Sequence, residues 1–339
     1  MSVTSEKSKL TLTSPGAFAA SLPALVGFHP EQSLVAVYLK GGMVQVTMRL
    51  DLPETLVETA EYVASTGTRV EADEVILAIY SPRGNDLPHR DGIEAVTAAC
   101  AAADIAVKDA MLVDGGRWWS YLCSNADCCP PEGQAIPEDT SLLEAERIGS
   151  GQLAVARSRE QIVDRYVPRP DLMPGRATRK DAQAILQVPV AERAQQAWDA
   201  VKMLAANPDM AGTDAGQVLR ARLQIAVGDV RVRDFIMTHI ALSEANTDAL
   251  VDTVVQAALT APVRLRPRIA GAAAALLAAC GESSIAVDCL LDLANGESLA
   301  TLVQASKDAV VPPQTLRQVF CESFPLVVAQ LREAKAITT

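Results

Sequence analysis

The sequence predicts an α/β domain with a mixed sheet and flanking helices over residues 1–155, followed by an all-α helical array over residues 181–339. Three observations predict this division. Short apolar runs of strand length alternate with helical patterns in the first third of the chain. Beyond residue 190 the apolar pattern has the helical period throughout. Between the two parts, residues 156–180 carry six arginines and three prolines with little periodicity, which predicts a linker.

The first predicted element is a helix that begins after Ser14. Ser14 is a favoured N-cap residue, and Pro15 suits the first helical position because its missing N–H has no partner there. Pro23 and Gly27 indicate the end of this helix. The chain then enters the turn "GFHP", which contains His29 and leads into the first strand.

The next segments predict a β-hairpin. Residues 33–39 form a continuous apolar run, which is typical of a strand that is covered on both faces. Residues 40–42 are the turn "KGG", and residues 43–51 then alternate strictly between apolar and polar side chains. We expect the apolar set of this second strand to face inward: Val44, Val46, Met48 and Leu50.

Alternation of helix and strand continues to about residue 122. Two segments with apolar residues at helical spacing and one more continuous apolar segment are followed by a second hairpin, which turns at "DGG". The predicted ranges are helices over 53–67 and 91–103, a strand over 74–80, and hairpin strands ending at 113 and starting at 117. Two hairpins within an alternating pattern favour a mixed sheet with helices on its faces.

The second half of the chain predicts short helices in series. Apolar stripes recur at helical spacing, and single proline or glycine residues separate them. The expected breaks are Pro208, Gly228, Pro262, Gly281, Gly296 and Pro312. This pattern is typical of antiparallel helical pairs or a repeat-like array, although no fixed period is present.

Composition limits the class of protein. Hydrophobic residues make up 49% of the 339 positions and charged residues 21%, which is ordinary for a globular protein. The net charge of −11 opposes general binding to nucleic acid or to anionic lipid. The N-terminal residues are polar and no apolar run is long enough to span a membrane, so we expect a cytoplasmic protein without a membrane partner.

Several stretches resemble a known family. They are Ser21–Leu39, Arg49–Pro53, "GRWWSYLCSNADCCPPEG" over Gly116–Gly133, and "VRVRDFIMTHI" over Val230–Ile240. These residues resemble the actinobacterial family termed domain of unknown function 4192, which phages of those hosts also carry. The resemblance covers nearly the whole chain and implies a helical C-terminal part, but it implies no particular reaction.

The cysteine loop within Gly116–Gly133 is the main candidate site. Cys123, Cys128 and Cys129 offer three thiolates, which are the ligands that zinc prefers. A fourth ligand could come from His29, His89 or Asp127. Against this, the spacing C-x4-C-C is not a usual zinc pattern, and adjacent cysteines bind one ion only with backbone strain. A strained disulfide between the adjacent cysteines is a further alternative.

A nucleophilic thiol is the second interpretation of the loop. Cys128 or Cys129 would attack a substrate, and His29 would act as the base. Nearby cations lower a cysteine pKa, and Arg49 and Arg117 would have this effect, with Asp51 as a further assisting residue. This hypothesis requires the "GFHP" turn and the cysteine loop to meet at the rim of one sheet.

A structural role is the third interpretation. Trp118 and Trp119 would occupy opposite faces of a strand, the diproline would stiffen the turn, and small buried thiols would fill space. Free cysteines are often buried and inert.

At the level of function, we expect a non-enzymatic protein that binds a protein partner or a second copy of itself. No phosphate-binding glycine loop, serine nucleophile elbow or H-E-x-x-H pair is present in the sequence. We therefore expect no cofactor, with zinc as the alternative. The competing hypothesis is a hydrolase or transferase that depends on the cysteine loop and His29.

Overall fold

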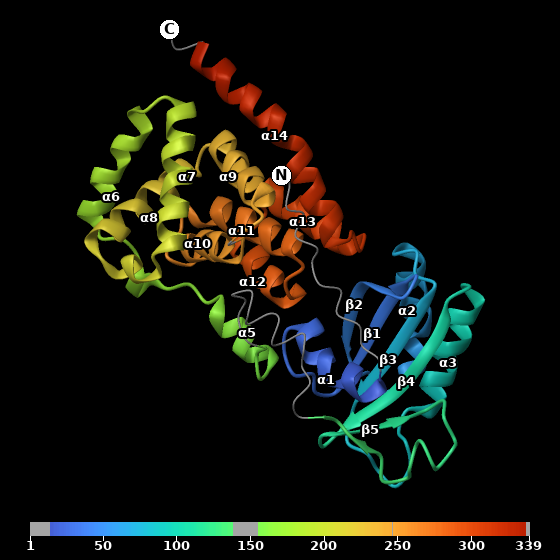
Figure 1. Ribbon diagram of the computed structural model, residues 1–339. Helices are drawn as coiled ribbons and strands as arrows, with labels where there is room; N and C mark the ends of the chain where they lie inside the picture. The colour runs from blue at the N-terminus through green and yellow to red at the C-terminus, as the bar shows by residue number, and fades with distance from the viewer. Residues whose placement is uncertain (1–13, 138–154, 246, 337–339) are drawn as a thin grey trace, which may run out of the picture. The chain divides into compact units, whose positions relative to one another are not determined.

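A computed structural model describes residues 14–137, 155–245 and 247–336. The chain forms two compact units, which divide between Arg159 and Glu160. The first unit contains a mixed sheet with helices, and the second is helical throughout its described residues (Figure 1). The predicted fold class is therefore confirmed.

The sheet of the first unit has six strands in the order β2-β1-β3-β4-β5-β6. The strands β3 and β4 are parallel, and every other neighbouring pair is antiparallel. A parallel pair needs a crossover connection, and helix α3 supplies it. The bounds are β1 Ser33–Lys40, β2 Met43–Asp51, β3 Glu74–Tyr80, β4 Ala106–Asp114, β5 Arg117–Ser120 and β6 Gln134–Ala135.

Helices cover both faces of this sheet. The helical elements are α1 Pro15–Val26, η1 Leu56–Thr59, α2 Ala60–Arg69 and α3 Arg90–Ala102. The buried Tyr38 hydroxyl of β1 donates a hydrogen bond of 2.8 Å to the carbonyl of Val63 in α2. On the opposite face, Gly16 of α1 lies against the indole of Trp118 in β5. A side chain at Gly16 would press on that ring.

The first predicted helix is confirmed at both ends. The Ser14 hydroxyl accepts the N–H of Ala17, and Gly27 adopts the left-handed conformation with φ of 92° at the C-cap. Pro23 lies inside the helix instead of ending it. Pro23 has no N–H to donate within the helix, and the helix continues for about one more turn, to Val26.

Strand β2 differs from the expected pattern. Val44 was predicted to face inward, yet 45% of its surface is exposed, and no residue of β2 is fully buried. The reason is the strand order, because β2 is an edge strand of the sheet. By contrast, the predicted burial of β1 is confirmed from Ser33 to Leu39.

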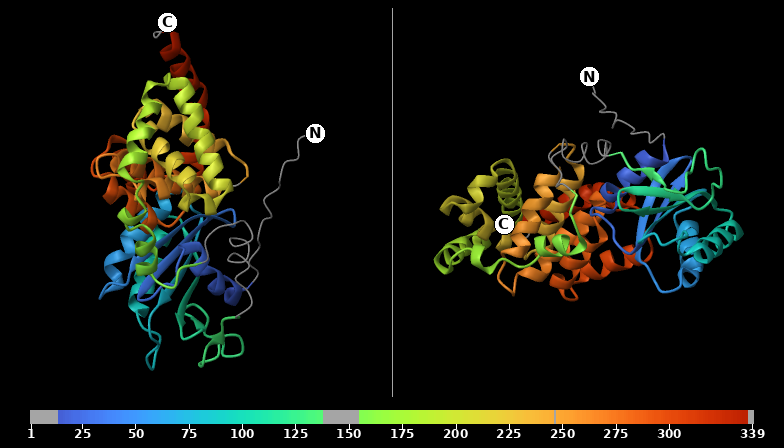
Figure 2. Two further views of the ribbon diagram at one scale, coloured as in Figure 1. Left: turned by 90° about the vertical axis from the view of Figure 1, so that its left-hand side faces the viewer. Right: turned by 90° about the horizontal axis from the view of Figure 1, so that it is seen from below.

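The second unit is a series of helices (Figure 2). All six predicted breaks fall between α-helices, and Pro208 begins the short 3-10 helix η4 Pro208–Gly212. The longer helices are α7 Val190–Ala206, α8 Asp214–Ala226, α9 Val230–Leu242, α10 Thr247–Leu259, α11 Arg266–Cys280, α12 Ser284–Ala294, α13 Ser298–Asp308 and α14 Pro313–Ala336. Helix α11 is apolar on all sides and packs on α10, α12, α13 and α14, as expected of a central helix.

The predicted linker over residues 156–180 is part of the folded structure. It contains helix α5 Arg159–Arg165, the turn η2 Pro170–Leu172 and most of helix α6 Arg176–Ala182, which packs on α8. Ile162 and Pro174 are buried. The N–H of Arg169 donates to the carbonyl of Leu259 over 2.8 Å. This segment therefore belongs mainly to the helical unit, and the turn η3 Gln183–Gln187 continues it.

Within the described part of the chain, no helix is both long enough and apolar enough to cross a bilayer. Helix α8 was not predicted from the sequence pattern. Helix α14 contains Pro325 and continues beyond it to Ala336.

Candidate functional site

The cysteine loop begins where β5 ends, and the Ser120 side chain determines its first turn. The Ser120 hydroxyl accepts hydrogen bonds of 3.1 Å from the N–H groups of Leu122 and Cys123. The same oxygen lies 3.5 Å from the carboxylate of Asp109 in β4. Burial raises the pKa of Asp109 above its ordinary value. Cys123 is thus held beside the sheet by a residue that precedes the loop.

Asn125 organises the middle of the loop. Its carbonyl accepts the N–H groups of Cys128 at 3.3 Å and Cys129 at 2.8 Å. Its side-chain oxygen accepts the N–H of Asp127 at 2.9 Å, which is an Asx turn. These bonds turn the chain back so that the two adjacent cysteines lie beside Cys123.

The end of the loop is attached to β5 by two side chains. The Trp119 indole donates to the carbonyl of Pro131 at 3.0 Å. The Arg117 guanidinium donates to the carbonyls of Glu132 at 2.8 Å and Gly133 at 2.7 Å. Gly133 has φ of +76°, and a Cβ there would lie 2.3 Å from the Trp119 ring. Arg117 therefore holds loop backbone.

Three thiols gather in this loop. The Cys123 and Cys128 sulfurs are 3.1 Å apart, and the Cys128 and Cys129 sulfurs are 3.9 Å apart. All three sulfur atoms lie within 4.8 Å of one another, and all three cysteines are free thiols. Cys128 is exposed, and the other two are partly buried. The structure thus brings together the three cysteines that the sequence singled out.

The three thiols differ in acidity. Hydrogen bonding from Cys128 lowers the pKa of Cys123, and the nearby backbone at Asn125 lowers it further. The same bond to Cys123 raises the pKa of Cys128. Burial and the neighbouring thiols raise the pKa of Cys129 to about 12. Cys123 is therefore the thiol that ionises first.

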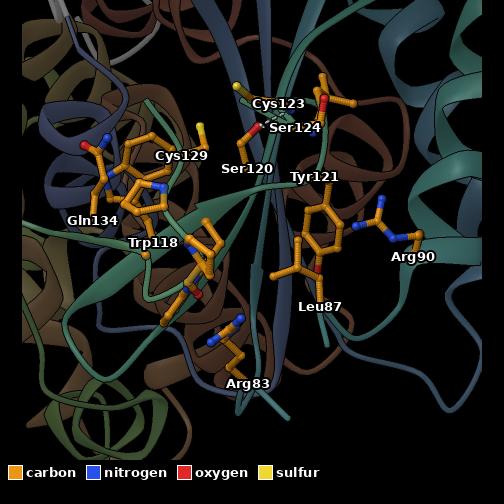
Figure 3. Close-up of a pocket in the computed structure, with 15 residues that line it drawn as sticks. Arg83, Leu87, Arg90, Trp118, Ser120, Tyr121, Cys123, Ser124, Cys129 and Gln134 are labelled. Atoms are coloured by element: carbon orange, nitrogen blue, oxygen red, sulfur yellow. Dashed lines mark hydrogen bonds between the residues drawn. The ribbon is translucent and has the colours of Figure 1, made fainter. Parts of the chain in front are cut away.

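A cavity of about 210 Å³ lies beside the thiols. Cys123 and Cys129 line it together with aromatic residues of β5, with Arg83 from the segment between β3 and α3, and with Arg90, the first residue of α3. In Figure 3 the two sulfurs lie at one end of the labelled group and Arg83 lies at the other, with Arg90 beside Tyr121.

The other predicted catalytic residues lie elsewhere in the sheet. The N–H of His29 donates to the carbonyl of Ala156 over 3.0 Å, and its side chain is exposed before β1. Arg49 forms an ion pair of 2.6 Å with Asp51 on the edge strand β2. Two strands, β3 and β4, separate β1 from β5. None of these three residues lines the cavity, so the structure does not bring the predicted base to the thiols.

The predicted fourth zinc ligands are also outside the thiol group. His29, His89 and Asp127 do not belong to the set of ligand atoms within 4.8 Å of one another. His89 precedes α3, where it adopts a left-handed conformation with φ of 58°. Within the described residues, three side chains of this group could bind a metal ion: Cys123, Cys128 and Cys129.

Comparison with known proteins gives one match. The sequence profile of the domain of unknown function 4192 matches residues 15–314. The chain belongs to this family. No curated protein and no solved structure matches the chain. The matched span of the 4192 family includes the cysteine loop and the cavity, whereas most of α14 lies beyond it.

In this member of the 4192 family, sequence reasoning missed the residues that surround the thiols. Ser120, Asn125, Arg83 and Arg90 were not singled out as site residues. A signal for the two arginines was present, because they follow β3, which is a parallel strand. Binding sites in α/β sheets often lie beyond the carboxyl ends of parallel strands.

Proposed function

We propose that the α/β unit is a non-enzymatic metal-binding module, and that Cys123, Cys128 and Cys129 bind one zinc ion. The observation that carries the proposal is the distance between the sulfur atoms. A tetrahedral zinc ion with bonds of 2.3 Å holds its ligand sulfurs about 3.8 Å apart. The separations here are 3.1 and 3.9 Å, with every pair within 4.8 Å. Small side-chain rotations would bring the three sulfurs to this spacing.

The backbone supports this use of adjacent cysteines. Among the described residues with positive φ, neither Cys128 nor Cys129 is present. The Asn125 carbonyl accepts both of their N–H groups, so the turn satisfies the backbone while it directs both side chains toward Cys123. This backbone supports the use of adjacent cysteines as ligands, because neither residue adopts the left-handed conformation.

Charge also favours a cation at this position. Burial is the main cause that raises the pKa of Cys129 to about 12, and repulsion from Cys123 and Cys128 adds to the rise. A divalent cation removes that repulsion, because the thiolate is the form that binds metal. Three thiolate ligands leave the fourth position of a tetrahedral ion for water or an external ligand.

Zinc titration of the full chain in the presence of a competing chromophoric chelator tests the proposal. We expect one zinc ion per chain, and a loss of tight binding in Cys123→Ser, Cys128→Ser and Cys129→Ser. The matched control is Cys321→Ser, because Cys321 is a free thiol of the helical unit whose sulfur contacts only the Ala241 carbonyl among the bonds described. Its variant should bind zinc like the wild type.

Two results would contradict the metal site. One is substoichiometric zinc in the reduced wild-type protein. The other is equal affinity in the Cys321 variant and the three loop variants. Mass spectrometry of the unreduced protein gives a further check, since a stable Cys123–Cys128 disulfide would remove two of the three ligands.

We further propose that the helical unit associates with a second copy of the chain through α14. Val319 and Leu326 are seven residues apart on one face of this helix, and their exposed fractions are 51% and 63%. Apolar residues at this spacing are typical of helix pairs that bury a shared seam. Exposed apolar groups of this kind gain free energy when they are covered.

Light scattering of the full chain over a range of concentrations tests this second proposal. We expect a dimer that becomes a monomer in the double variant Val319→Glu/Leu326→Glu. The control is Gln318→Glu/Gln330→Glu, which adds the same charge at exposed polar positions of α14. A wild-type monomer at all concentrations would refute self-association.

A further inference from the structure

The cavity beside the cysteine loop has a charge opposite to that of the whole protein. The chain has a net charge of −11, yet the described residues that line the cavity include Arg83 and Arg90 and no aspartate or glutamate. Two cations in a partly enclosed space produce a local positive field. Arg90 is exposed and Arg83 is partly buried, so solvent screens part of this charge, and the Asp114 carboxylate, which is outside the cavity lining, accepts the backbone N–H of Arg83 at 2.8 Å. The positive charge of the lining itself favours an anionic ligand.

Both guanidinium groups face aromatic rings of the cavity wall. Arg83 lies 4.9 Å from the centre of the Trp119 ring, and Arg90 lies 6.0 Å from that of Tyr121. These cation–π contacts hold the planar groups in place and leave their N–H edges for another partner. Neither guanidinium belongs to a salt bridge identified among the described residues.

Arg83 provides the second observation. Its Nε is buried and has no hydrogen-bond partner. A buried N–H of a charged group without an acceptor is unfavourable, and such groups are nearly always satisfied. The covered Nε does not reach the cavity, so an anion bound there would be held by the terminal guanidinium nitrogens of Arg83, which are not among the buried unpaired atoms.

The size and walls of the cavity define the class of ligand. Its volume of about 210 Å³ is below the roughly 300–1,000 Å³ of typical cofactor and drug sites. A dinucleotide is therefore too large. Leu87, Leu122 and Pro130 supply apolar wall beside the two arginines, so the ligand needs a compact apolar part as well as a charge.

We propose that this cavity binds a small organic anion whose carboxylate or phosphate group is held by Arg83 and Arg90, with its apolar part against Leu87 and Pro130. Arginine binds both oxyanion types through paired hydrogen bonds. This inference goes beyond the zinc site and does not depend on it. Cys123 and Cys129 line the cavity, but Cys128 does not, so the two sites can be separated by mutation.

Isothermal titration of the full chain with four probes tests the proposal. Benzoate and phenyl phosphate carry an apolar ring and an anion, benzyl alcohol lacks the charge, and inorganic phosphate lacks the ring. We expect saturable binding of benzoate or phenyl phosphate, and at least about tenfold weaker binding of the other two. Tighter binding of phenyl phosphate would assign a phosphate ester, and tighter binding of benzoate would assign a carboxylate.

Variants connect this binding to the arginines. Arg83→Gln and Arg90→Gln should each weaken the binding of the preferred probe by about tenfold or more. Arg83→Lys should lose less affinity for the probe than Arg83→Gln, since lysine retains the charge but not the planar donors. The control Arg222→Gln changes an exposed arginine of α8 and should bind like the wild type. Circular dichroism of each variant confirms that it is folded.

The outcome for Cys128→Ser separates this inference from the zinc site. We expect this variant to lose zinc and to retain the affinity of the preferred probe. The anion proposal is overturned if neither aryl anion binds saturably at millimolar concentration, if benzyl alcohol binds equally well, or if both glutamine variants bind like the wild type. None of these results bears on zinc binding.

Discussion

Arg233 of α9 donates a hydrogen bond of 2.8 Å from its guanidinium to the carboxylate of Glu297, which caps α13. The two side chains are 9% and 11% exposed, so the ion pair is almost fully buried. The second oxygen of Glu297 accepts the N–H of Leu299 at 2.8 Å. One carboxylate therefore joins two helices and satisfies the start of one of them.

Replacement of Glu297 by alanine should strongly destabilise the helical unit. The change removes one of the two carboxylates paired with the buried Arg233, whose Nε still donates to Asp234 at 2.8 Å, and it also removes the side-chain cap of α13. Complete loss of a partner in a buried ion pair costs about 3–5 kcal/mol of unfolding free energy, so with Asp234 retained we expect about 2–3 kcal/mol. Urea denaturation followed by circular dichroism measures the effect. Glu71→Ala is the control, because Glu71 pairs with Lys40 at an exposed site and its loss should leave stability nearly unchanged. Equal stability of the two variants would contradict a structural role for the buried pair.

A histidine in the helical unit predicts a pH dependence of stability. His239 lies between the rings of Trp198, Phe235 and Phe324, with centroid distances from 3.9 to 5.2 Å. Its Nδ1 lies 2.8 Å from the carbonyl of Phe235, so this nitrogen carries the proton of the neutral ring. Burial lowers the pKa of His239, and the charge of Lys202 lowers it further.

Because the folded protein disfavours protonated His239, the unfolded chain takes up that proton more readily. The stability contribution is complete above the unfolded pKa of about 6.5 and is lost as the pH falls below it. We expect the melting temperature of the wild type to decrease between about pH 7 and pH 5, with a smaller decrease in His239→Gln. His29→Gln, at an exposed position, should keep the wild-type dependence. An unchanged slope in His239→Gln would rule out this group as the cause.

Gly133 tests whether the end of the cysteine loop supports the thiol cluster. Alanine there would bring a Cβ within 2.3 Å of the Trp119 ring at a φ of +76°. Gly133→Ala should therefore displace the loop and weaken zinc binding by about tenfold or more, because ligand positions tolerate little displacement. Gly41→Ala is matched in backbone strain, with φ of +57°, but has no atom within 4 Å of the added Cβ. The same chelator competition measures both, and equal affinities would contradict the support role.

Local patterns were sufficient to predict much of the fold. Residues 33–39 lie in the sheet with helices on both faces, so a continuous apolar run was enough to identify β1. Gly281 ends α11 because its left-handed conformation interrupts the hydrogen-bond ladder locally, and α12 ends before Asn295 and Gly296, which are both left-handed. Local patterns were not sufficient at β2, because the exposure of its side chains depends on its position at the edge of the sheet.

The candidate site shows the same limit. The three cysteines are close in sequence, so their grouping was predictable. Arg83 reaches Trp119 only because β3 pairs with β4 and β4 pairs with β5, and such long-range pairing is not encoded in local spacing. For the same reason His29, before β1, was placed near the thiols in the sequence hypothesis and is separated from β5 by two strands in the structure.

Zinc binding at the thiol cluster should release protons and depend steeply on pH. The pKa of Cys128 is raised by its bond to Cys123, and that of Cys129 is raised to about 12, so both thiols hold their protons at pH 7. Metal binding requires thiolates, and we expect the release of about two to three protons per ion at pH 7. Affinity should therefore fall as the pH is lowered.

Titration calorimetry in buffers of different ionisation enthalpy measures this release. The heat should vary linearly with buffer enthalpy, and the slope gives the number of protons. In Cys128→Ser one titrating thiol is absent, so any residual zinc binding should release about one proton fewer. A wild-type slope near zero would mean that zinc binds without displacing thiol protons. Since neutral thiols are poor zinc ligands, the metal would then have to be bound elsewhere in the chain.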